Sequence, residues 1–361
     1  MRKLLIGLLA IGLVFAFVAP SFATDVSFSG AYRVRGFNFD NGGSAIKDDP
    51  AGTATSQYMD QRFRVNMAFA VADGIGLVAR GDIMEKAWGT ADPAKEFDFD
   101  KAYGWFNTGI GTFTLGKNSD LLWGTAFADE EAFTEYAQWT NSFGPVFALL
   151  RVVKGEENDR GATNADLDCD LYKAAVVYSW EGGQAGLLGV YVRDAADRTA
   201  GTPYIGKYWV WTPYVKATFG PVDFEAEAAW LIGAAADYED STSDVDYDGA
   251  SYYAQAKVNM GPANVGLMYA FVSGDDPTTA DLEMGYTGSD WNPSVVLFND
   301  QGDGHAAGSC FGIVDGSYTG TQVFQIFAGI SPIEKLTMRA ALSKWYVDEK
   351  GTAADDDIGT T

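Results

Sequence analysis

Five arginines stand at alternate positions of short stretches near the start of the chain, and an acidic segment follows them. The arginines are Arg33, Arg35, Arg62, Arg64 and Arg80. The acids of the segment 118–132 are Asp120, Asp129, Glu130 and Glu131. A guanidinium group keeps its charge and offers a planar fork to carboxylates and phosphates. Opposed rows of such charges could set up a field that orients solutes, or could form a salt-bridged wall that stiffens the fold.

Two runs of alternating aspartates suggest a second kind of chemistry, the binding of Ca²⁺. The first run is Asp244, Asp246 and Asp248, and the second is Asp166, Asp168 and Asp170. The first has the spacing of a calcium-binding loop with Gly249 at the sixth place, although Gln255 stands at the twelfth, where such loops carry Glu. Both interpretations stay open: Ca²⁺ bound at external loops, or solvated acidic loops.

Residues suited to catalysis are scarce. The only histidine is His305, and its proximity to Ser309 and Cys310 is explained by chance. The chain has no phosphate-binding glycine loop and no Cys-x-x-Cys metal pair. A formal charge of −24 at pH 7 argues against a nucleic-acid partner, because phosphates repel an acidic protein. We expect no enzymatic activity and no cofactor beyond the Ca²⁺ considered above, and whether Cys169 and Cys310 form a disulfide is open.

The arginines belong to stretches in which apolar and polar residues alternate. In 62–82, RFRVNMAFAVADGIGLVARGD, the residues Phe63, Val65 and Met67 alternate with polar ones. A period of two predicts β-strands, and Ala72-Asp73-Gly74 predicts a tight turn between two of them. An arginine that faced lipid at the bilayer midplane would cost about 2–4 kcal/mol, so the arginine face of this hairpin must meet water or acids.

The same pattern recurs along the chain and predicts fifteen strands joined alternately by short turns and long polar segments. The predicted strands are 25–39, 57–71, 75–86, 97–108, 112–118, 133–143, 146–154, 170–180, 185–194, 207–219, 222–232, 250–260, 265–273, 322–330 and 336–347. Many run to ten residues or more, the length of a tilted transmembrane strand. Aromatic residues gather near strand ends, as at the two interfaces of a membrane barrel. These are Trp180, Trp209, Trp211, Phe219, Trp230, Trp345 and Tyr346.

The N-terminus has the features of a secretory signal peptide. Arg2 and Lys3 precede an apolar run from Leu4 to Val18, and Ser21-Phe22-Ala23 fits a cleavage site after Ala23. We expect a signal peptide at 1–23 and a single β-domain at 24–361. After residue 23 no apolar run is long enough for a transmembrane helix, so the mature chain is predicted to be a soluble exported protein or a membrane barrel.

The chain resembles the Gram-negative outer-membrane porin superfamily, in particular the proteobacterial porins of about sixteen strands. The resemblance is carried by the signal peptide, the opening strand DVSFSGAYRVRGF at 25–37, the hairpin at 62–82, and the alternation of short turns with long loops. It implies an antiparallel transmembrane β-barrel with short periplasmic turns and long external loops. Fifteen is an odd number, so we expect 16 to 18 strands in the complete barrel, with the last strand or strands missing from this chain.

The resemblance also implies a function. It predicts a homotrimeric, water-filled channel in the cell outer membrane that passes small hydrophilic solutes and ions. The third external loop, with Asp120 and Glu130, would fold into the lumen opposite the arginines. Acidic external loops could also be bridged to lipopolysaccharide by divalent ions. Two alternatives stay open: a non-conducting surface barrel, such as an adhesin or a lipopolysaccharide-anchored scaffold, and a secreted soluble β-protein.

Overall fold

The computed structural model describes most of the chain that follows the predicted signal peptide. The described residues are 25–39, 56–90, 97–120, 122–129, 132–158, 166–199, 203–239, 243–276, 278–288, 291, 293, 319–348 and 357–360. The predicted signal peptide at 1–23 lies outside these residues, as do Glu130, Glu131, His305 and Cys310.

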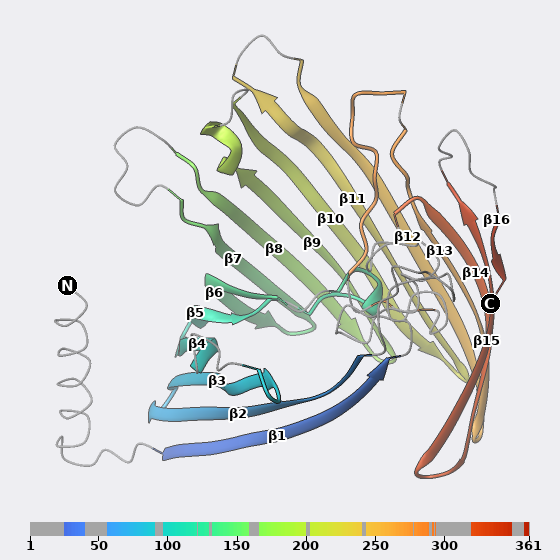
Figure 1. Ribbon diagram of the computed structural model, residues 1–361, viewed down its shortest axis with the longest axis horizontal. Helices are drawn as coiled ribbons and strands as arrows, with labels where there is room; N and C mark the ends of the chain where they lie inside the picture. The colour runs from blue at the N-terminus through green and yellow to red at the C-terminus, as the bar shows by residue number, and fades with distance from the viewer. Residues whose placement is uncertain are drawn as a thin grey trace.

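The chain forms one antiparallel sheet in which neighbours in the sequence are neighbours in space (Figure 1). In the described part of the chain the sheet has sixteen strands. They are β1 Asp25–Phe39, β2 Ser56–Ala72, β3 Ile75–Ala87, β4 Phe97–Thr108, β5 Gly111–Ser119, β6 Phe133–Phe143, β7 Val146–Glu156, β8 Cys169–Trp180, β9 Gly183–Asp194, β10 Tyr204–Phe219, β11 Val222–Tyr238, β12 Val245–Met260, β13 Ala263–Val272, β14 Thr321–Ile333, β15 Leu336–Val347 and β16 Asp357–Thr360. Two 3-10 helices, η1 at Ala126–Ala128 and η2 at Ala196–Thr199, lie in the connections.

The fifteen predicted strands coincide with β1 to β15, which confirms the all-β antiparallel architecture. The structure adds β16, which follows the last predicted strand and pairs with β15. Sequence periodicity missed β16 because its four residues are too few to show an alternation. Among the described residues, no helix has the length and apolar character required to cross a membrane.

Tight turns join the strands at one end of the sheet. Gly144, Gly220 and Gly261 occupy these turns with φ between 60° and 61°. This left-handed backbone conformation is readily accessible to glycine and is strained for most other residues. It allows β6–β7, β10–β11 and β12–β13 to reverse within a few residues and holds adjacent strands in antiparallel register.

The two faces of the sheet carry opposite kinds of side chain. Leu150 and Ile326 are 56% and 57% exposed, whereas their strand neighbours Arg151 and Gln325 are 4% and 2% exposed. Large apolar groups therefore cover the outer face, and polar groups are enclosed on the inner face. This arrangement is the reverse of a soluble β-sandwich, whose apolar faces pack together in a core. An apolar outer band of this kind fits contact with lipid.

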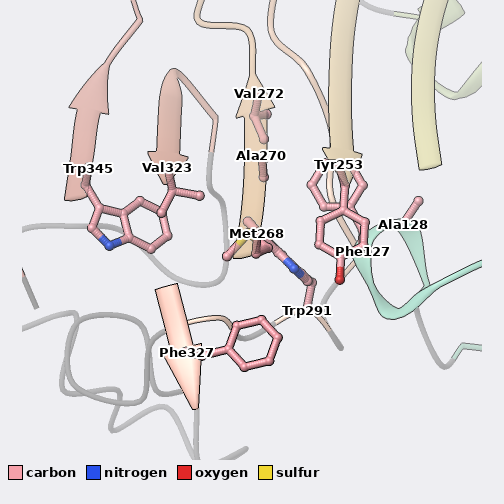
Figure 2. Close-up of a cluster of buried hydrophobic side chains, with 10 residues drawn as sticks. All are labelled: Phe127, Ala128, Tyr253, Met268, Ala270, Val272, Trp291, Val323, Phe327 and Trp345. Atoms are coloured by element: carbon pink, nitrogen blue, oxygen red, sulfur yellow. The ribbon is translucent and has the colours of Figure 1, made fainter. Parts of the chain in front are cut away.

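Two connections pack against the inner face instead of staying at its rim. The inner loop, of which residues 120, 122–129 and 132 are described, joins β5 to β6. A second inner segment, of which residues 285–288, 291 and 293 are described, lies between β13 and β14. Side chains from both form a buried cluster with β12 to β15, in which Phe127 and Trp345 are fully buried. Figure 2 shows the rings of Phe127, Tyr253 and Trp291 lying together, with Trp345 beside Val323 at the other side of the cluster.

The predicted aromatic girdle is confirmed in part. Trp209 and Phe219 are 42% and 62% exposed on the outer face, and Trp209 stacks on Trp211 with ring centroids 5.2 Å apart. Trp345 was wrongly assigned to the girdle, because its side chain is 0% exposed and belongs to the inner cluster. A position near a strand end does not reveal which face a residue occupies once a loop covers the inner face.

Leu342 and Ala341 provide a direct test of the two faces, since these neighbours in β15 point to opposite sides. We expect Leu342→Lys to lower the free energy of unfolding in lipid vesicles by about 2–4 kcal/mol, because the charge would face the acyl chains. Ala341→Lys, the matched control, should change it by much less. Urea titration of protein folded in vesicles measures both, and equal losses would contradict the assignment of the faces.

Candidate functional site

Charged side chains of β1 to β4 form a cluster of ion pairs on the inner face, which we call the arginine cluster. Arg64 donates to Asp82 from Nε and from Nη2, each over 2.6 Å. The Arg80 Nε donates to Asp100 over 2.8 Å, and its Nη2 lies 2.7 Å from Asp100 Oδ2. Two-point pairing of this kind fixes the plane of a guanidinium as well as its position.

The other three arginines complete this cluster. The Arg35 Nε donates to both carboxylate oxygens of Asp60 over 3.1 Å. Arg33 and Arg62 stand directly opposite each other in the register of β1 and β2. Glu85 offsets this like-charge contact, with its Oε1 3.4 Å from Arg33 Nη2 and 3.7 Å from Arg62 Nη1. The five arginines thus lie together, and acids of their own wall surround them.

The structure places Asp120 beside a different pair of cations, Arg151 of β7 and Lys173 of β8. The Arg151 Nη1 and the Lys173 Nζ each donate to an Asp120 oxygen over 2.5 Å. These two residues are paired in the β7–β8 register. The Arg151 guanidinium also lies 4.0 Å from the centroid of the Tyr136 ring. Sequence reasoning missed Arg151, which interrupts an otherwise apolar stretch and shares the inner parity of Leu149 and Val153.

Of the remaining predicted acids, Asp129 is the one that the structure describes. Asp129 accepts a hydrogen bond over 3.1 Å from the backbone N–H of Trp123 within the same loop. Glu130 and Glu131 lie outside the described residues. Asp129 therefore shapes the loop itself.

Glu227 of β11 anchors the tip of the inner loop to the opposite wall. Its Oε2 accepts hydrogen bonds from the backbone N–H of Thr125 over 2.8 Å and from the Thr125 hydroxyl over 2.6 Å. Both residues are buried, at 4% and 3% exposure. The loop departs from β5 and rejoins the sheet at β6, so a contact with β11 requires it to cross the interior of the curved sheet.

Gly124 makes this close approach possible. Its φ is +61°, and a Cβ placed on it would lie 2.6 Å from the Glu227 Cδ. Any other side chain would push the loop away from the carboxyl group. Beside it, Trp123 donates from Nε1 to the carbonyl oxygen of Thr212 over 2.7 Å, which adds a second anchor on β10.

The second inner segment secures the other side of the inner loop. The Tyr286 hydroxyl donates to the carbonyl oxygen of Ala128 over 2.9 Å. Trp291 meets Phe127 edge to face at 5.0 Å between ring centroids. The interior therefore has two unlike sides, with ion pairs on β1 to β4 and largely apolar packing on β7 to β15.

No protein-family model and no curated protein sequence matches the chain, but solved structures match its fold. A BenF-like porin from Pseudomonas fluorescens Pf-5 superposes with a TM-score of 0.55 at 10% identity, over 93% of this chain and 85% of that chain. OccK2 (OpdF) from Pseudomonas aeruginosa, solved in complex with glucuronate, gives 0.53 at 12% identity, over 93% and 84%. This chain has the fold of the Gram-negative outer-membrane porins.

Two of the three aspartates of the first run lie in a paired strand and not in a loop. Asp246 and Asp248 lie within β12, which begins at Val245 and pairs with β11, so the predicted loop geometry is wrong. Asp244 caps the end of β11 by accepting from the Tyr238 N–H over 2.9 Å. Among the described residues, no three His, Cys, Asp or Glu side chains gather as a metal site.

The second run of aspartates neutralises cations at the rim of the porin fold. Asp166 pairs with Arg193, and Asp168 pairs with Lys154. These hydrogen bonds to cationic donors lower the pKa of both Asp166 and Asp168 below the ordinary value. The aspartate at 170 also contacts Lys154, over 3.1 Å. The run is thus a set of separate ion pairs.

Removing the Glu227 anchor tests whether the inner loop is held across the interior. Glu227→Ala deletes the acceptor of both Thr125 hydrogen bonds, and a typical intramolecular hydrogen bond contributes about 0.5–1.5 kcal/mol. We expect larger and noisier single-channel currents, because the released loop would fluctuate and leave a wider path across the interior. Glu225→Ala is the matched control, since Glu225 binds Tyr253 over 2.6 Å instead. Identical currents from Glu227→Ala and the unmodified protein would contradict the anchor.

Acid should loosen the rim at Asp166 and Asp168. A lowered pKa in the folded state means that the ion pairs stabilise the fold above the ordinary aspartate pKa of about 3.9. That contribution is lost as the pH falls below the ordinary pKa and through the lowered pKa of the folded state. We expect faster intrinsic-rate-corrected amide exchange in a peptide spanning Asp166–Asp170 at pH 3 than at pH 5. The centre of β8 serves as the control, and unchanged exchange at both sites would contradict the prediction.

Proposed function

We propose that this chain is an outer-membrane porin, a passive channel for small hydrophilic solutes and ions. The observation that carries the proposal is the division of one sheet into an exposed apolar face and an inner face rich in charges, with a loop crossing the interior. In lipid, charged groups are tolerated where they line a water-filled space or pair with one another. The chain accordingly lies in the outer membrane with its inner face toward water.

The constriction lies where the inner loop crosses the interior. The arginine cluster forms one wall, and Asp120, held by Arg151 and Lys173, marks the base of the loop. Glu130 and Glu131 belong to the same loop and add negative charge to it. Arginines fixed by bidentate pairs keep their orientation, and such a wall can turn a dipolar solute as it passes.

Weak cation selectivity follows from the charge balance. The five arginines share four carboxylates in their ion pairs, namely those of Asp60, Asp82, Glu85 and Asp100. This wall is therefore nearly neutral. The whole chain carries a formal charge of −24. Because the arginine wall is nearly neutral, this excess of acids lies elsewhere, and at the channel mouths it attracts cations.

The proposed assembly is a homotrimer embedded in outer-membrane lipid and lipopolysaccharide. The resemblance to the porin superfamily supports the trimer, and the exposed apolar band supports the lipid contact. No chemical step is assigned to the chain, and the proposed role is permeation without catalysis or a cofactor.

Planar-bilayer recording of the purified, folded chain tests this proposal. We expect stepwise currents in KCl and, under a KCl gradient, a reversal potential displaced toward that of K⁺, because the acidic mouths enrich cations. A heat-denatured sample, which lacks the folded barrel, is the control.

Two outcomes would count against parts of the proposal. A reversal potential on the Cl⁻ side would contradict the cation selectivity while leaving the channel in place. Folded protein that inserts into the bilayer and carries no current would favour the non-conducting surface barrel instead.

A further inference from the structure

A cavity of about 380 Å³ lies inside the sheet, between the inner loop and the walls formed by β8 to β11. Its volume falls within the range of small-molecule sites, about 300–1,000 Å³. Trp123 and Ala128 of the inner loop line one side, and Tyr286 of the second inner segment adjoins them. The cavity is distinct from the arginine cluster, which belongs to β1 to β4.

The wall of this cavity is mostly apolar, which is unusual for the inner face of a water-filled channel. The β8–β9 and β9–β10 registers place Lys173, Val190 and Val210 in one row across the three strands. In the next row, Leu188 of β9 is paired with Thr212 of β10. Leu188 and Val190 are 8% and 9% exposed, so the inner loop covers them. Apolar surface of this kind gains free energy when a solute replaces water.

Lys173 gives the cavity a positive end. Its ammonium group has three donors, and Asp120 accepts one of them. Arg151 is the second cation on Asp120, so two positive charges share one carboxylate. The Arg151 donors are directed to Asp120 and to Gln138, at 2.6 Å from Nη2 and 2.9 Å from Nε. The Lys173 side chain is only 9% exposed, and an anion beside it would offset its desolvated charge.

Thr212 supplies a second polar group within the same cavity. Thr212 is 4% exposed, and among the described residues its Oγ1 has no hydrogen-bond partner. A buried hydroxyl without a partner is costly, because it has given up its hydrogen bonds to water. Lys173 and Thr212 are two strands apart, roughly 10 Å at the usual strand spacing. The apolar row between them therefore has the length of a short carbon chain or one ring.

We propose that this cavity binds a small organic anion with an apolar body. The anionic group meets Lys173, the body lies against Val190 and Val210 under Trp123, and a polar group at the far end of a longer solute reaches Thr212. The inference rests on the proposed function and names a solute class for the same lumen. Bulk cation selectivity arises at the acidic mouths, whereas this site selects one class of solute by contact.

Block of the KCl current by hexanoate tests this inference in the folded, full-length protein. Acetate has the charge without the body, and hexanamide has the body without the charge. We expect hexanoate to halve the current at a concentration about tenfold below that of either comparator, because each of the two contributions is worth about a factor of ten.

Variants separate the two contributions. Lys173→Met should raise the half-blocking concentration of hexanoate about tenfold, and Lys173→Arg should largely preserve it. Val190→Thr, which keeps the shape and adds a hydroxyl, should weaken the block by hexanoate and leave that by acetate unchanged. Lys257→Met is the matched control, because Lys257 lies on β12 beside Asp223, away from the cavity.

The outcomes distinguish the site from the channel. A KCl current with equal block by hexanoate and acetate, or a Lys173→Met variant indistinguishable from the unmodified protein, would overturn the site and leave the porin proposal standing. Absence of any KCl current would overturn the porin proposal. In that case, calorimetric titration of the detergent-folded protein with hexanoate tests the site. Binding by the unmodified protein that is lost in Lys173→Met supports the site, and no binding by the unmodified protein overturns it.

Discussion

The structure depends on one constraint, that the hydrocarbon core of a membrane offers no hydrogen-bond partner to a polypeptide backbone. Strands satisfy this constraint by pairing with their neighbours, and β1 to β16 do so in chain order. Pairing leaves each strand with two faces and a period of two. Side chains such as Leu150 and Arg151 are adjacent in the sequence, and in the proposed membrane barrel the first faces lipid and the second faces the interior.

The same constraint concentrates charged side chains on the inner face. Their arrangement there is set by the ion pairs that neighbouring side chains form. On β1 to β4, arginines and carboxylates alternate across strands and neutralise one another. On β7 and β8 a single acid from the inner loop, Asp120, serves two cations. The rest of that side is largely apolar and is covered by the inner loop, which Glu227 and Thr212 hold in place. The interior is therefore asymmetric, with a charged wall facing a largely apolar one.

The alternation of residues was enough to predict the sheet. Phe63 and Arg64 could be placed on opposite faces from the sequence, because strand parity is a local property, and the five arginines were expected together for the same reason. The partner of Asp120 could not be predicted, since the path of a loop depends on contacts with strands far along the chain. Thr125 and Glu227 are 102 residues apart, and no periodicity connects them. The calcium interpretation of Asp246 and Asp248 could not be decided from the sequence, because alternating acids occur both in calcium loops and on one face of a strand.

The central claim is that one face of each strand meets water inside the molecule and the other meets lipid. Asn66 and Met67 of β2 are adjacent and lie on opposite faces by this account. In a background of Cys169→Ser and Cys310→Ser, single cysteines are introduced as Asn66→Cys or Met67→Cys, and a charged, membrane-impermeant thiol reagent is added during bilayer recording. The account predicts rapid reaction and a reduced current for Asn66→Cys, with neither for Met67→Cys. Equal reaction at both positions, or reaction at Met67→Cys alone, would contradict it.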